Sequence, residues 1–482
     1  MIYDIIIIGA GVVGTSIARE LARYQLKIAL VEKEQELAFG VSKSNSGIIH
    51  PGTQNSFNSL KGKLCVKGNK LIRKIARELG VDFKEVGELI VAFNDQDMAH
   101  LEKLKNEGTR LKVPRLRIVN RAWLTSYEPN LSKAAVGALY APTAGIVSPY
   151  RLAYDMAENA VRNGVKIYTN SKVTEISQVK SEKDSKAHFE ITTPNGILNA
   201  RYVINAAGLF ADEISRLVGI DNFKITPRKG EEFILDKKRE HMTNHLLFPL
   251  PTKTSKGILV IKTSDGNPMI GPTAEDCADK EDLSTSEEGL KKVLEGVSRM
   301  IPTINKNDII AYFAGLRPVA GDDFIIRHES TVPGFVNVAG IQSPGLTAAP
   351  AIALMVCDIL KSSGLKLEKR RVFHAHRKKT AHLFSLSLAK IRKFIKKNPS
   401  YGDIVCRCEM VSKKEIEEAI DRGATTLDGI KFRTRAQAGR CHGGFCTPRI
   451  LKILSQRLEK LPTEITKNGS GSEMIAEERD ND

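Results

Sequence analysis

The stretch that decides the fold is Tyr3–Gly14, which reads YDIIIIGAGVVG. Its first half is a nearly continuous apolar, β-branched run, as expected for a strand buried on both faces of a parallel sheet. Three glycines follow at the spacing G-x-G-x-x-G, and residues 15–24 then carry apolar residues at helical spacing. A second apolar run, Ile28–Val31, completes a predicted strand–turn–helix–strand unit.

Each residue of this motif has a physical task. Gly9 allows the tight turn, and Gly11 lets the backbone approach a pyrophosphate held at the partly positive end of the helix. Gly14 permits close packing of the helix on the strand. Glu32 can accept hydrogen bonds from ribose hydroxyls, and its charge would repel the 2′-phosphate of NADP. The motif predicts a dinucleotide site and leaves FAD and NAD open; a structural turn without ligand is the alternative.

Length and composition bound the remaining possibilities. The chain has 482 residues, of which 41% are hydrophobic and 27% charged. That length suggests about three domains, and that composition argues against a mostly disordered chain. We expect no membrane-spanning segment, because no stretch approaches the ~18 apolar residues required. We also expect no signal peptide, because the N-terminus lacks a basic region and is interrupted by Asp4.

Positive charge is concentrated in residues 366–400. They hold twelve Lys or Arg residues against the single acid Glu368, a net charge of +11 within a total of +17. No nucleic-acid fold signature accompanies this charge, so we do not expect a nucleic-acid partner. The segment is either a solvated, partly helical linker or a docking surface for an acidic partner or an anionic membrane face.

Four of the seven cysteines lie near the C-terminus, namely Cys406, Cys408, Cys441 and Cys446. Clusters of this kind in a chain of this length bind metal more often than they form disulfides, so we expect a reducing, cytoplasmic compartment. Thiolates select soft metals, which leaves zinc, an iron–sulfur cluster or free thiols. Zinc ribbons use C-x2–4-C pairs at both ends, so the tight C-x-C pair argues against a ribbon.

Candidate reactive residues follow the first unit. The segment Asn45–Gly52 reads NSGIIHPG inside an irregular loop, and an imidazole such as His50 can remove a hydroxyl proton near neutral pH. Arg317, beside the rigid Pro318, can offer a bidentate fork to an anionic group. Lys253, Lys256 and Lys262 flank a predicted strand at 258–261.

Three glycine motifs together resemble the glycine oxidase/D-amino-acid oxidase-like superfamily of FAD enzymes over about residues 1–365. These are the motif at Gly9, the pair Ala207-Gly208 and the segment Gly340–Gly345. The resemblance implies tightly bound FAD with its isoalloxazine ring at a domain interface. The N-S-G-x-I-H-x-G segment resembles glycerol-3-phosphate oxidases and dehydrogenases and L-2-hydroxyglutarate dehydrogenases, in which the matching histidine is placed as general base.

The same resemblance implies roles for individual residues. Catalytic roles fall to His50, to Arg317 facing the substrate's phosphate or carboxylate, and to Lys256 as the best match for a phosphate-binding lysine. The implied cofactor contacts are Gly9, Gly11, Gly14, Glu32, Ser46, Gly47, Val173, Ala207, Gly208, Gly315, Gly340, Ser343, Gly345, Leu346 and Thr347.

The cysteine pattern C-R-C-E followed by C-H-G-G-F-C resembles the bacterioferritin-associated-ferredoxin-like [2Fe-2S] domain. Its nearest likenesses are the tails of the anaerobic glycerol-3-phosphate dehydrogenase large subunit and of some amino-acid dehydrogenases. The resemblance implies that Cys406, Cys408, Cys441 and Cys446 hold a [2Fe-2S] cluster.

The expected fold class is α/β, with a Rossmann-like FAD-binding domain, an inserted strand-rich α+β substrate domain and a small, mainly helical C-terminal [2Fe-2S] domain. The expected boundaries are 1–85, 145–225 and 325–365 for the FAD-binding domain, 86–144 and 226–324 for the substrate domain, 366–401 for a basic linker, 402–462 for the [2Fe-2S] domain and 463–482 for a disordered tail. The expected strands are Tyr3–Ile8, Ile28–Val31, Val165–Tyr168, Val173–Ile176, Phe189–Thr193, Ala200–Ile204 and Phe335–Val338. The expected helices include Thr15–Tyr24, Leu64–Leu79, Arg151–Asn163, Ser286–Met300, Ala348–Leu360 and Lys413–Arg422.

The expected function is an FAD-dependent dehydrogenase that oxidises a small anionic secondary alcohol, foremost sn-glycerol 3-phosphate to dihydroxyacetone phosphate. Electrons would leave through the cluster to an acceptor protein or a quinone-linked subunit, with peripheral association at the inner face of the membrane as one option. The alternatives are an L-2-hydroxyglutarate or other 2-hydroxy acid dehydrogenase, a proline-like amino-acid dehydrogenase, and a non-catalytic electron-transfer subunit of a larger complex.

Overall fold

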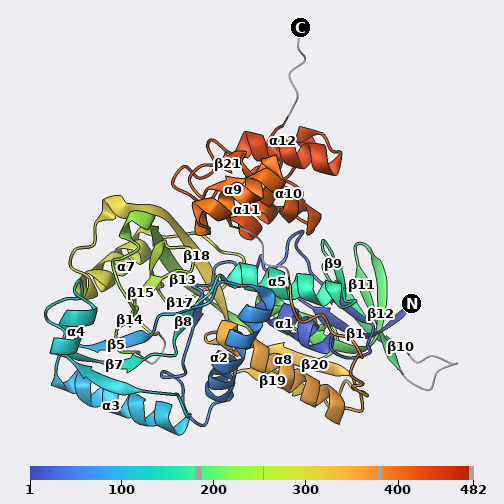
Figure 1. Cartoon of the computed structure of the whole chain (residues 1–482). Helices are drawn as coiled ribbons and strands as arrows, with labels where there is room; N and C mark the ends of the chain where they lie inside the picture. The colour runs from blue at the N-terminus through green and yellow to red at the C-terminus, as the bar shows by residue number, and fades with distance from the viewer. Residues whose placement is uncertain (180–186, 253–254, 378–381, 477–482) are drawn as a thin grey trace. The chain divides into compact units, whose positions relative to one another are not determined.

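The structure is a computed structural model that describes residues 1–179, 187–252, 255–377 and 382–476 (Figure 1). Its contacts divide the chain into two compact units. The first unit comprises residues 1–31 and 38–376, and the second comprises residues 32–37 and 377–482.

An eight-stranded sheet with a parallel centre forms one half of the first unit. Its strands lie in the order β10-β11-β12-β1-β2-β9, and β20, itself paired with β19, adds to β12. β1 pairs in parallel with both β2 and β12. Every residue of β2 and most of β1 are buried, as the continuous apolar runs predict. The bounds are β1 Ile2–Ile8, β2 Ile28–Val31, β9 Lys166–Tyr168, β10 Glu175–Val179, β11 His188–Thr193, β12 Gly196–Asn205, β19 Ile325–His328 and β20 Phe335–Ala339.

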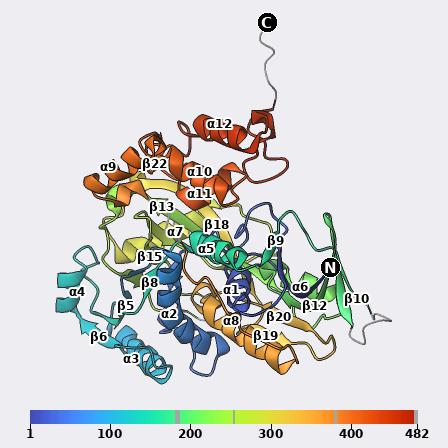
Figure 2. The ribbon, with the colours of Figure 1, turned by 45° about the vertical axis from the view of Figure 1, so that its right-hand side comes forward.

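The helices of this half pack on one another as well as on the sheet. α1 contacts α5 and α8, and α2 contacts α8; α1, α2 and α8 lie side by side in both ribbon views (Figures 1 and 2). α2 and α8 approach so closely that a Cβ added at Gly68 would lie 1.9 Å from the carbonyl oxygen of Thr347. The helix bounds are α1 Val12–Leu21, α2 Leu60–Leu79, α5 Pro149–Arg162, α6 Ala211–Arg216 and α8 Gly345–Ser362.

α8 corrects the expectation that no stretch is apolar enough to cross a membrane. Its 18 residues have a mean hydropathy of 1.4, and among the described residues it is the one helix that meets the length and composition of a membrane span. However, 61% of this stretch is buried inside the protein, where it packs against α1 and α2. α8 is therefore explained as a core helix.

A nine-stranded, largely antiparallel sheet forms the other half of the first unit. Its strands lie in the order β17-β13-β16-β15-β14-β5-β7-β6, with β18 pairing β13 along almost its whole length. The strand bounds are β5 Glu88–Ala92, β6 Arg117–Asn120, β7 Gly137–Ala141, β13 Thr226–Leu235, β14 Leu246–Phe248, β15 Leu259–Lys262, β16 Pro268–Gly271, β17 Glu275–Asp276 and β18 Ile309–Val319. Also present in this unit are β3 Ile48–Ile49, β4 Lys84–Glu85, β8 Gly145–Ile146, α3 Asp95–Arg110, α4 Arg121–Tyr127 and α7 Glu287–Met300.

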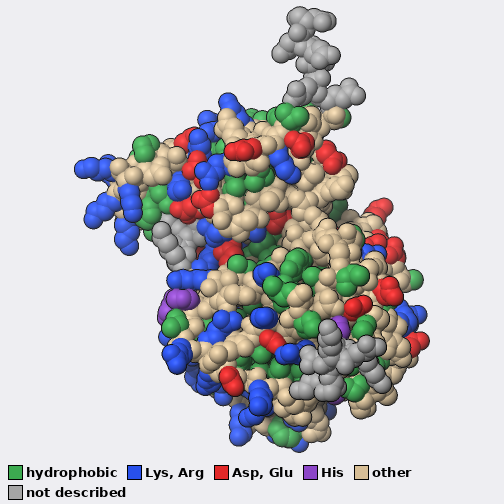
Figure 3. All heavy atoms as spheres, turned by 90° about the vertical axis from the view of Figure 1, so that its right-hand side faces the viewer, with side chains coloured by type: hydrophobic (Ala, Val, Ile, Leu, Met, Phe, Trp, Pro, Cys, Tyr) green, Lys and Arg blue, Asp and Glu red, His purple; other side chains and the backbone are tan. Residues whose placement is uncertain are grey.

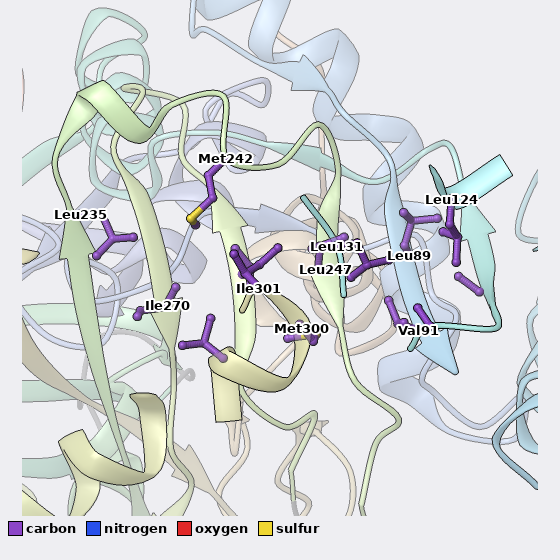
Figure 4. Packing of buried hydrophobic residues seen from close by; sticks show 14 of the residues in the cluster. Leu89, Val91, Leu124, Leu131, Leu235, Met242, Leu247, Ile270, Met300 and Ile301 are labelled. Atoms are coloured by element: carbon purple, nitrogen blue, oxygen red, sulfur yellow. The ribbon is translucent and has the colours of Figure 1, made fainter. Parts of the chain in front are cut away.

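The two faces of this sheet differ in chemistry. One face packs a hydrophobic cluster that includes Leu89, Leu247 and Ile270 together with residues of α7 (Figure 4). Side chains alternate along a strand, so Glu88, Glu232 and Arg317 lie on the opposite face. Hydrophobic residues of that face form a second cluster. Charged residues set among apolar ones make this face the candidate functional face.

The second unit is a small helical domain around its own core. Its core includes Val405, Ile416, Leu427, Ile450 and Leu454, and the chain crosses it in one short hairpin and a series of helices. The bounds are α9 Leu388–Lys397, β21 Ile404–Cys406, β22 Val411–Ser412, α10 Lys413–Asp421, α11 Leu427–Thr434 and α12 Thr447–Leu458.

The structure confirms the expected fold class, with an α/β sheet, a strand-rich second sheet and a mainly helical C-terminal unit. Several helices begin earlier than expected: α1 at Val12 rather than Thr15, α2 at Leu60 rather than Leu64, and α8 at Gly345 rather than Ala348. The apolar spacing detects only the residues that face the core, whereas the first turn of a helix is occupied by capping residues and unpaired N–H groups.

Two segments expected to be loosely held are packed. Arg370, in the expected linker, donates from its guanidinium to the carbonyls of Tyr24 and Leu26 within the first unit. In the expected tail, Ile465 is 1% exposed in the core of the second unit, and Lys467 N–H donates to Ser472. Residues 463–476 are therefore part of that unit, while 477–482 lie outside the described residues.

Gly68→Ala should destabilise the first unit, because the new methyl group would have to displace the backbone of α8 at Thr347. We expect a loss of roughly 1–3 kcal/mol in the free energy of unfolding, the usual range for overpacking. Gly40→Ala is the control, since a Cβ there meets nothing within 4 Å. Urea unfolding followed by tryptophan fluorescence measures both; equal midpoints for the two variants would contradict the close α2–α8 contact.

Candidate active site

The glycine turn after β1 is held by close backbone approaches that exclude side chains. Gly9 has a φ of +102°, and a Cβ there would lie 2.5 Å from the carbonyl oxygen of Ala206. At Gly14 a Cβ would lie 1.9 Å from the carbonyl oxygen of Gly9. The turn therefore starts α1 directly at the carboxyl end of β1, the place where doubly wound sheets bind a pyrophosphate.

The start of α1 suits an anion. The helix begins after Gly11 with no acidic residue in its first turn, so its own side chains do not neutralise the positive end of the helix dipole. The hydroxyl of Ser42, which the sequence did not single out, accepts the N–H of Val12 at 2.9 Å. Glu32 directly follows β2, the neighbour of β1. The turn and the start of α1 fit a dinucleotide with its pyrophosphate at the N-terminus of α1, and the ribose contact of Glu32 stays a prediction.

Three further glycines assigned to the cofactor have the positive φ that favours glycine. They are Gly47 at +79°, Gly208 at +58° and Gly340 at +64°. A Cβ at Gly47 would lie 2.2 Å from the carbonyl oxygen of Val147, and one at Gly315 would lie 2.6 Å from the hydroxyl of Ser44. Gly47 and Gly315 thus hold the 44–47 loop close to β18 and to the start of α5.

The other assigned cofactor residues divide by what their side chains do. Val173 and Leu346 are buried in separate hydrophobic clusters, so only their backbones are available to a ligand. Ser46 lies in the 44–47 loop, and Gly345 is the first residue of α8. Ala207 precedes the short turn at Gly208. Ser343 and Thr347, at the start of α8, instead contact the predicted catalytic histidine.

His50 is fixed in place by its backbone. Its N–H donates to the hydroxyl of Thr347 at 2.9 Å, and its carbonyl accepts from the side-chain amide of Asn69 at 3.0 Å. The imidazole lies edge-on to Phe248, with ring centroids 6.0 Å apart, and is 12% exposed. The hydroxyl of Ser343 lies 3.5 Å from Nε2. Contacts from α2, α8 and β14 therefore set both the position and the tilt of the ring.

A lysine and a glutamate flank this ring. Lys256 Nζ lies 3.4 Å from Nε2 and 3.5 Å from Nδ1 of His50. A carboxylate oxygen of Glu88 also lies near the ring, 4.0 Å from Nδ1. Glu88 is 0% exposed; its second oxygen accepts a hydrogen bond from the hydroxyl of Thr53. The carboxylate favours a proton on Nδ1, which leaves Nε2 as the acceptor.

This environment sets the protonation states. Burial, assisted by the charge of Lys256 and opposed by Glu88, lowers the pKa of His50 to about 4. Burial also lowers the pKa of Lys256 to about 8, although Glu88 opposes the shift. At neutral pH the imidazole is therefore uncharged and able to accept a proton, while the lysine beside it is still mostly a cation.

Arg317 belongs to the same face of the second sheet. Its guanidinium crosses Gly230, where a Cβ would lie 2.6 Å from Nη2, and it donates to the carbonyl of Thr273 at 3.3 Å. Its charge acts on Lys256, helping to lower the pKa of that lysine. The structure thus brings Arg317, Lys256 and His50 to one region, as the sequence predicts; Lys253 lies outside the described residues.

Two carboxylates in this region were missed by the sequence analysis. Glu88 faces His50, and Glu232, 5% exposed, lies within electrostatic range of Arg317. Burial raises the pKa of Glu232 to about 8, so it is largely neutral at pH 7 and leaves most of the charge of Arg317 uncancelled. The available signal was acidic residues within apolar strands, one in β5 and the adjacent pair Glu231 and Glu232 in β13, which buried strands ordinarily avoid.

The four C-terminal cysteines gather as two thiol pairs in the second unit. The sulfur of Cys408 lies 3.5 Å from that of Cys441, and Cys406 and Cys446 form the other hydrogen-bonded pair. Backbone N–H groups of Glu409 and Gln437 donate to the sulfur of Cys406. Cys406 and Cys446 are buried, whereas Cys408 is exposed, so a bound group would have one edge toward solvent.

Two pairs of thiols suit two irons better than one zinc. A structural zinc ion is held by four ligands around one point, whereas these four thiols lie as two separate pairs. A [2Fe-2S] cluster takes four thiolates, two on each iron, and its sulfurs accept backbone hydrogen bonds of the kind present at Cys406. The residues present therefore fit a [2Fe-2S] cluster.

Comparison with known families matches both units. Residues 4–359 match the family model "FAD dependent oxidoreductase", and residues 404–456 match "BFD-like [2Fe-2S] binding domain". The second match contains all four clustered cysteines. FAD and a [2Fe-2S] cluster are thus the cofactors of this chain, which settles the choice between FAD and NAD that the glycine motif left open.

Individual relatives agree with this assignment. The chain is 43% identical over 476 residues to a glycerol 3-phosphate dehydrogenase of Caloramator mitchellensis, covering 98% of each. It is 26% identical to an anaerobic glycerol-3-phosphate dehydrogenase subunit A1 of Haloferax volcanii, over 95% of this chain and 83% of the relative. In structure it resembles the dithionite-reduced, FAD-bound L-alpha-glycerophosphate oxidase of Mycoplasma pneumoniae, with a TM-score of 0.73, 32% identity, and coverage of 78% of this chain and 98% of the other.

Cys406→Ser should abolish iron binding, because it removes one of the four thiolates and breaks a buried pair. We expect the purified, anaerobically reconstituted protein to hold about two iron atoms per chain, and the variant to hold almost none. Cys277→Ser, outside the cluster, is the control and should keep full iron content. Iron retention by Cys406→Ser, or one zinc per chain in the parent protein, would contradict the assignment.

Proposed function

The chain belongs to the family of FAD-dependent oxidoreductases, and on that premise we propose that it oxidises sn-glycerol 3-phosphate to dihydroxyacetone phosphate. The observation that carries this proposal is the contact of a neutral, buried imidazole with a lysine cation, with an arginine on the same sheet face. This arrangement fits a small substrate with an anionic end and a carbinol. The relatives named for glycerol 3-phosphate support the choice of phosphate over carboxylate.

In this proposal Lys256 and Arg317 bind the phosphate. Both lie in a poorly hydrated region, where ion pairs with an incoming dianion are stronger than at the surface. Arg317 offers a planar fork, and Lys256 a point charge directly beside His50. An anion held by both would place its neighbouring hydroxyl next to the imidazole.

His50 then takes the hydroxyl proton. Nε2 is the available acceptor, since Glu88 stabilises the proton on Nδ1 and the positive charge that develops on the ring. FAD, when bound, supplies a two-electron acceptor for the hydride of the carbinol carbon. Thr347 and Asn69 hold the backbone of His50, so the base does not need to reorganise during the reaction.

The second unit supports a dehydrogenase rather than a simple oxidase. A [2Fe-2S] cluster carries one electron at a time and therefore offers an exit to a separate acceptor, which we propose is an electron-transfer protein or a quinone-linked subunit. The exposed Cys408 marks the edge available to that acceptor. We propose a reducing, cytoplasmic location, since all seven cysteines are unbridged.

The test of substrate identity is an anaerobic panel. The purified holoprotein is mixed with sn-glycerol 3-phosphate, L-2-hydroxyglutarate or L-proline, and flavin absorbance is followed. We expect rapid bleaching with glycerol 3-phosphate alone. Preferential bleaching by either rival would replace the proposed substrate, and no bleaching by any of the three would favour a non-catalytic electron-transfer role.

His50→Asn should slow flavin reduction by roughly 10²–10⁴-fold, the usual contribution of a general base. His100→Asn, at an exposed position of α3, is the control and should leave the rate unchanged. Stopped-flow measurement under argon separates reduction from later electron transfer, and flavin content checks that both variants stay loaded. An amine substrate reacts as its free base, so a near-normal rate in His50→Asn would contradict alcohol oxidation by this site.

The pKa of Lys256 predicts an alkaline limit to activity. Because the lysine binds the phosphate as a cation, kcat/KM should be maintained below about pH 8 and fall as pH rises through that value. Lys256→Arg keeps its charge and should remove this limb from the measurable range. Glu88→Gln removes the carboxylate that raises the lysine's pKa, so it should move the limb to lower pH. If the alkaline fall in kcat/KM occurs at the same pH in both variants, it is caused by a group other than Lys256.

A further inference from the structure

We infer that α9 binds the surface of an anionic lipid bilayer, lying in the plane of the interface. The helix, Leu388–Lys397, reads LAKIRKFIKK and contains five cations and no acid. None of its residues is buried, although the helices α10 to α12 of the same unit all bury an apolar face. Neither the flavin site nor the cysteine cluster uses it.

The apolar side of α9 is partly exposed, with Ile391 half-buried and Leu388 the most exposed residue. Leu388, Ile391 and Ile395 follow the i, i+3, i+7 spacing of one helical face. Leu388 is 75% exposed and Ile395 is 36% exposed. Phe394, on the flank, packs its ring against Tyr401 at 5.1 Å and so fastens the helix to its own unit. Leu388, Ile391 and Ile395 therefore form a short apolar strip, and the contact of Phe394 with Tyr401 holds the helix along one side of that strip.

The rest of the circumference of α9 is a basic arc, which begins at Arg392 beside the apolar face. Lys390, Arg392, Lys393, Lys396 and Lys397 are all exposed. In the part of the chain that the structure describes, none of the five forms an ion pair with a carboxylate. Lys and Arg side chains gather at one end of this unit in the space-filling view (Figure 3). Their charge is therefore available to an external partner.

A bilayer fits these features better than an acidic protein. Four of the five cations are lysines, which protein interfaces disfavour but anionic headgroups attract without a fixed geometry. A helix of this composition, with apolar residues on one side and cations on the other, is the kind that lies at a membrane interface. At roughly 15 Å long it is too short to span a bilayer. A location at the membrane would place the cluster-bearing unit where a quinone-linked acceptor works.

The experiment is vesicle flotation of the full-length holoprotein at near-physiological salt. The probes are vesicles of phosphatidylcholine alone and vesicles with about one third phosphatidylglycerol. We expect binding to the anionic vesicles only, weakened as salt rises. The double variant Lys393→Gln, Lys396→Gln should bind about 30-fold more weakly, since each cation contributes roughly fivefold. Leu388→Ser should weaken binding by about tenfold through lost apolar insertion.

Matched controls separate this result from loss of folding or of catalysis. Lys452→Gln, Lys460→Gln removes two exposed lysines of the same unit outside α9 and should bind like the parent. All variants should keep the flavin content, the iron content and the rate of anaerobic flavin reduction of the parent protein. Vesicle flotation measures binding alone, so its result does not depend on whether the proposed substrate is correct. If the protein binds neither type of vesicle, the inference is overturned and an acidic protein becomes the better partner for α9. Equal binding to both vesicle types, or equal losses in the control variant, also overturns it.

Discussion

His50 and its two charged neighbours meet with little water around them: Lys256 lies 3.4 Å from the imidazole and a carboxylate oxygen of Glu88 lies 4.0 Å from it. A buried cation and a buried carboxylate are each costly alone, but when both lie beside one neutral ring their charges partly balance. The arrangement holds the imidazole uncharged while keeping a cation beside it. An anionic substrate supplies the negative charge that this site is short of, which links binding to the placement of the base.

Maintaining that contact requires β3 and α8 to be held at a fixed position against the nine-stranded sheet. His50 follows β3 and is held by Thr347 of α8, whereas Glu88 begins β5 and Lys256 precedes β15. The close approach of α2 to α8 at Gly68, and of the 44–47 loop to β18 at Gly315, leaves little freedom between these elements. Glycines therefore have two roles. Gly9 and Gly14 form the turn before α1, and Gly68 and Gly315 allow the elements around the catalytic residues to pack closely.

Local pattern was enough to predict the first strand, the glycine turn and the thiol cluster, and the family resemblance singled out His50, Lys256 and Arg317, whose catalytic roles stay predictions. It could not predict their partners. Lys256 meets His50 across 206 residues of sequence, and Thr53 meets Glu88 across 35. The strand order β15-β14-β5 brings Lys256 and Glu88 to one part of the sheet, where the loop after β3 meets both. Glu88 is the first residue of the strand ELIVA, so in the sequence it resembles a polar residue at the exposed end of a strand. Only its partners in the fold show that it is part of the site. The packing of Ile465 was missed for the same reason, since a polar, Gly/Ser-rich sequence after it suggested disorder.

The most direct test of the central claim is a crystal structure of the reduced holoprotein with sn-glycerol 3-phosphate bound. The account predicts a phosphate within hydrogen-bonding distance of both Lys256 and Arg317, and the secondary hydroxyl on Nε2 of His50. A phosphate held by neither cation, or a substrate whose carbinol lies away from the imidazole, would contradict it.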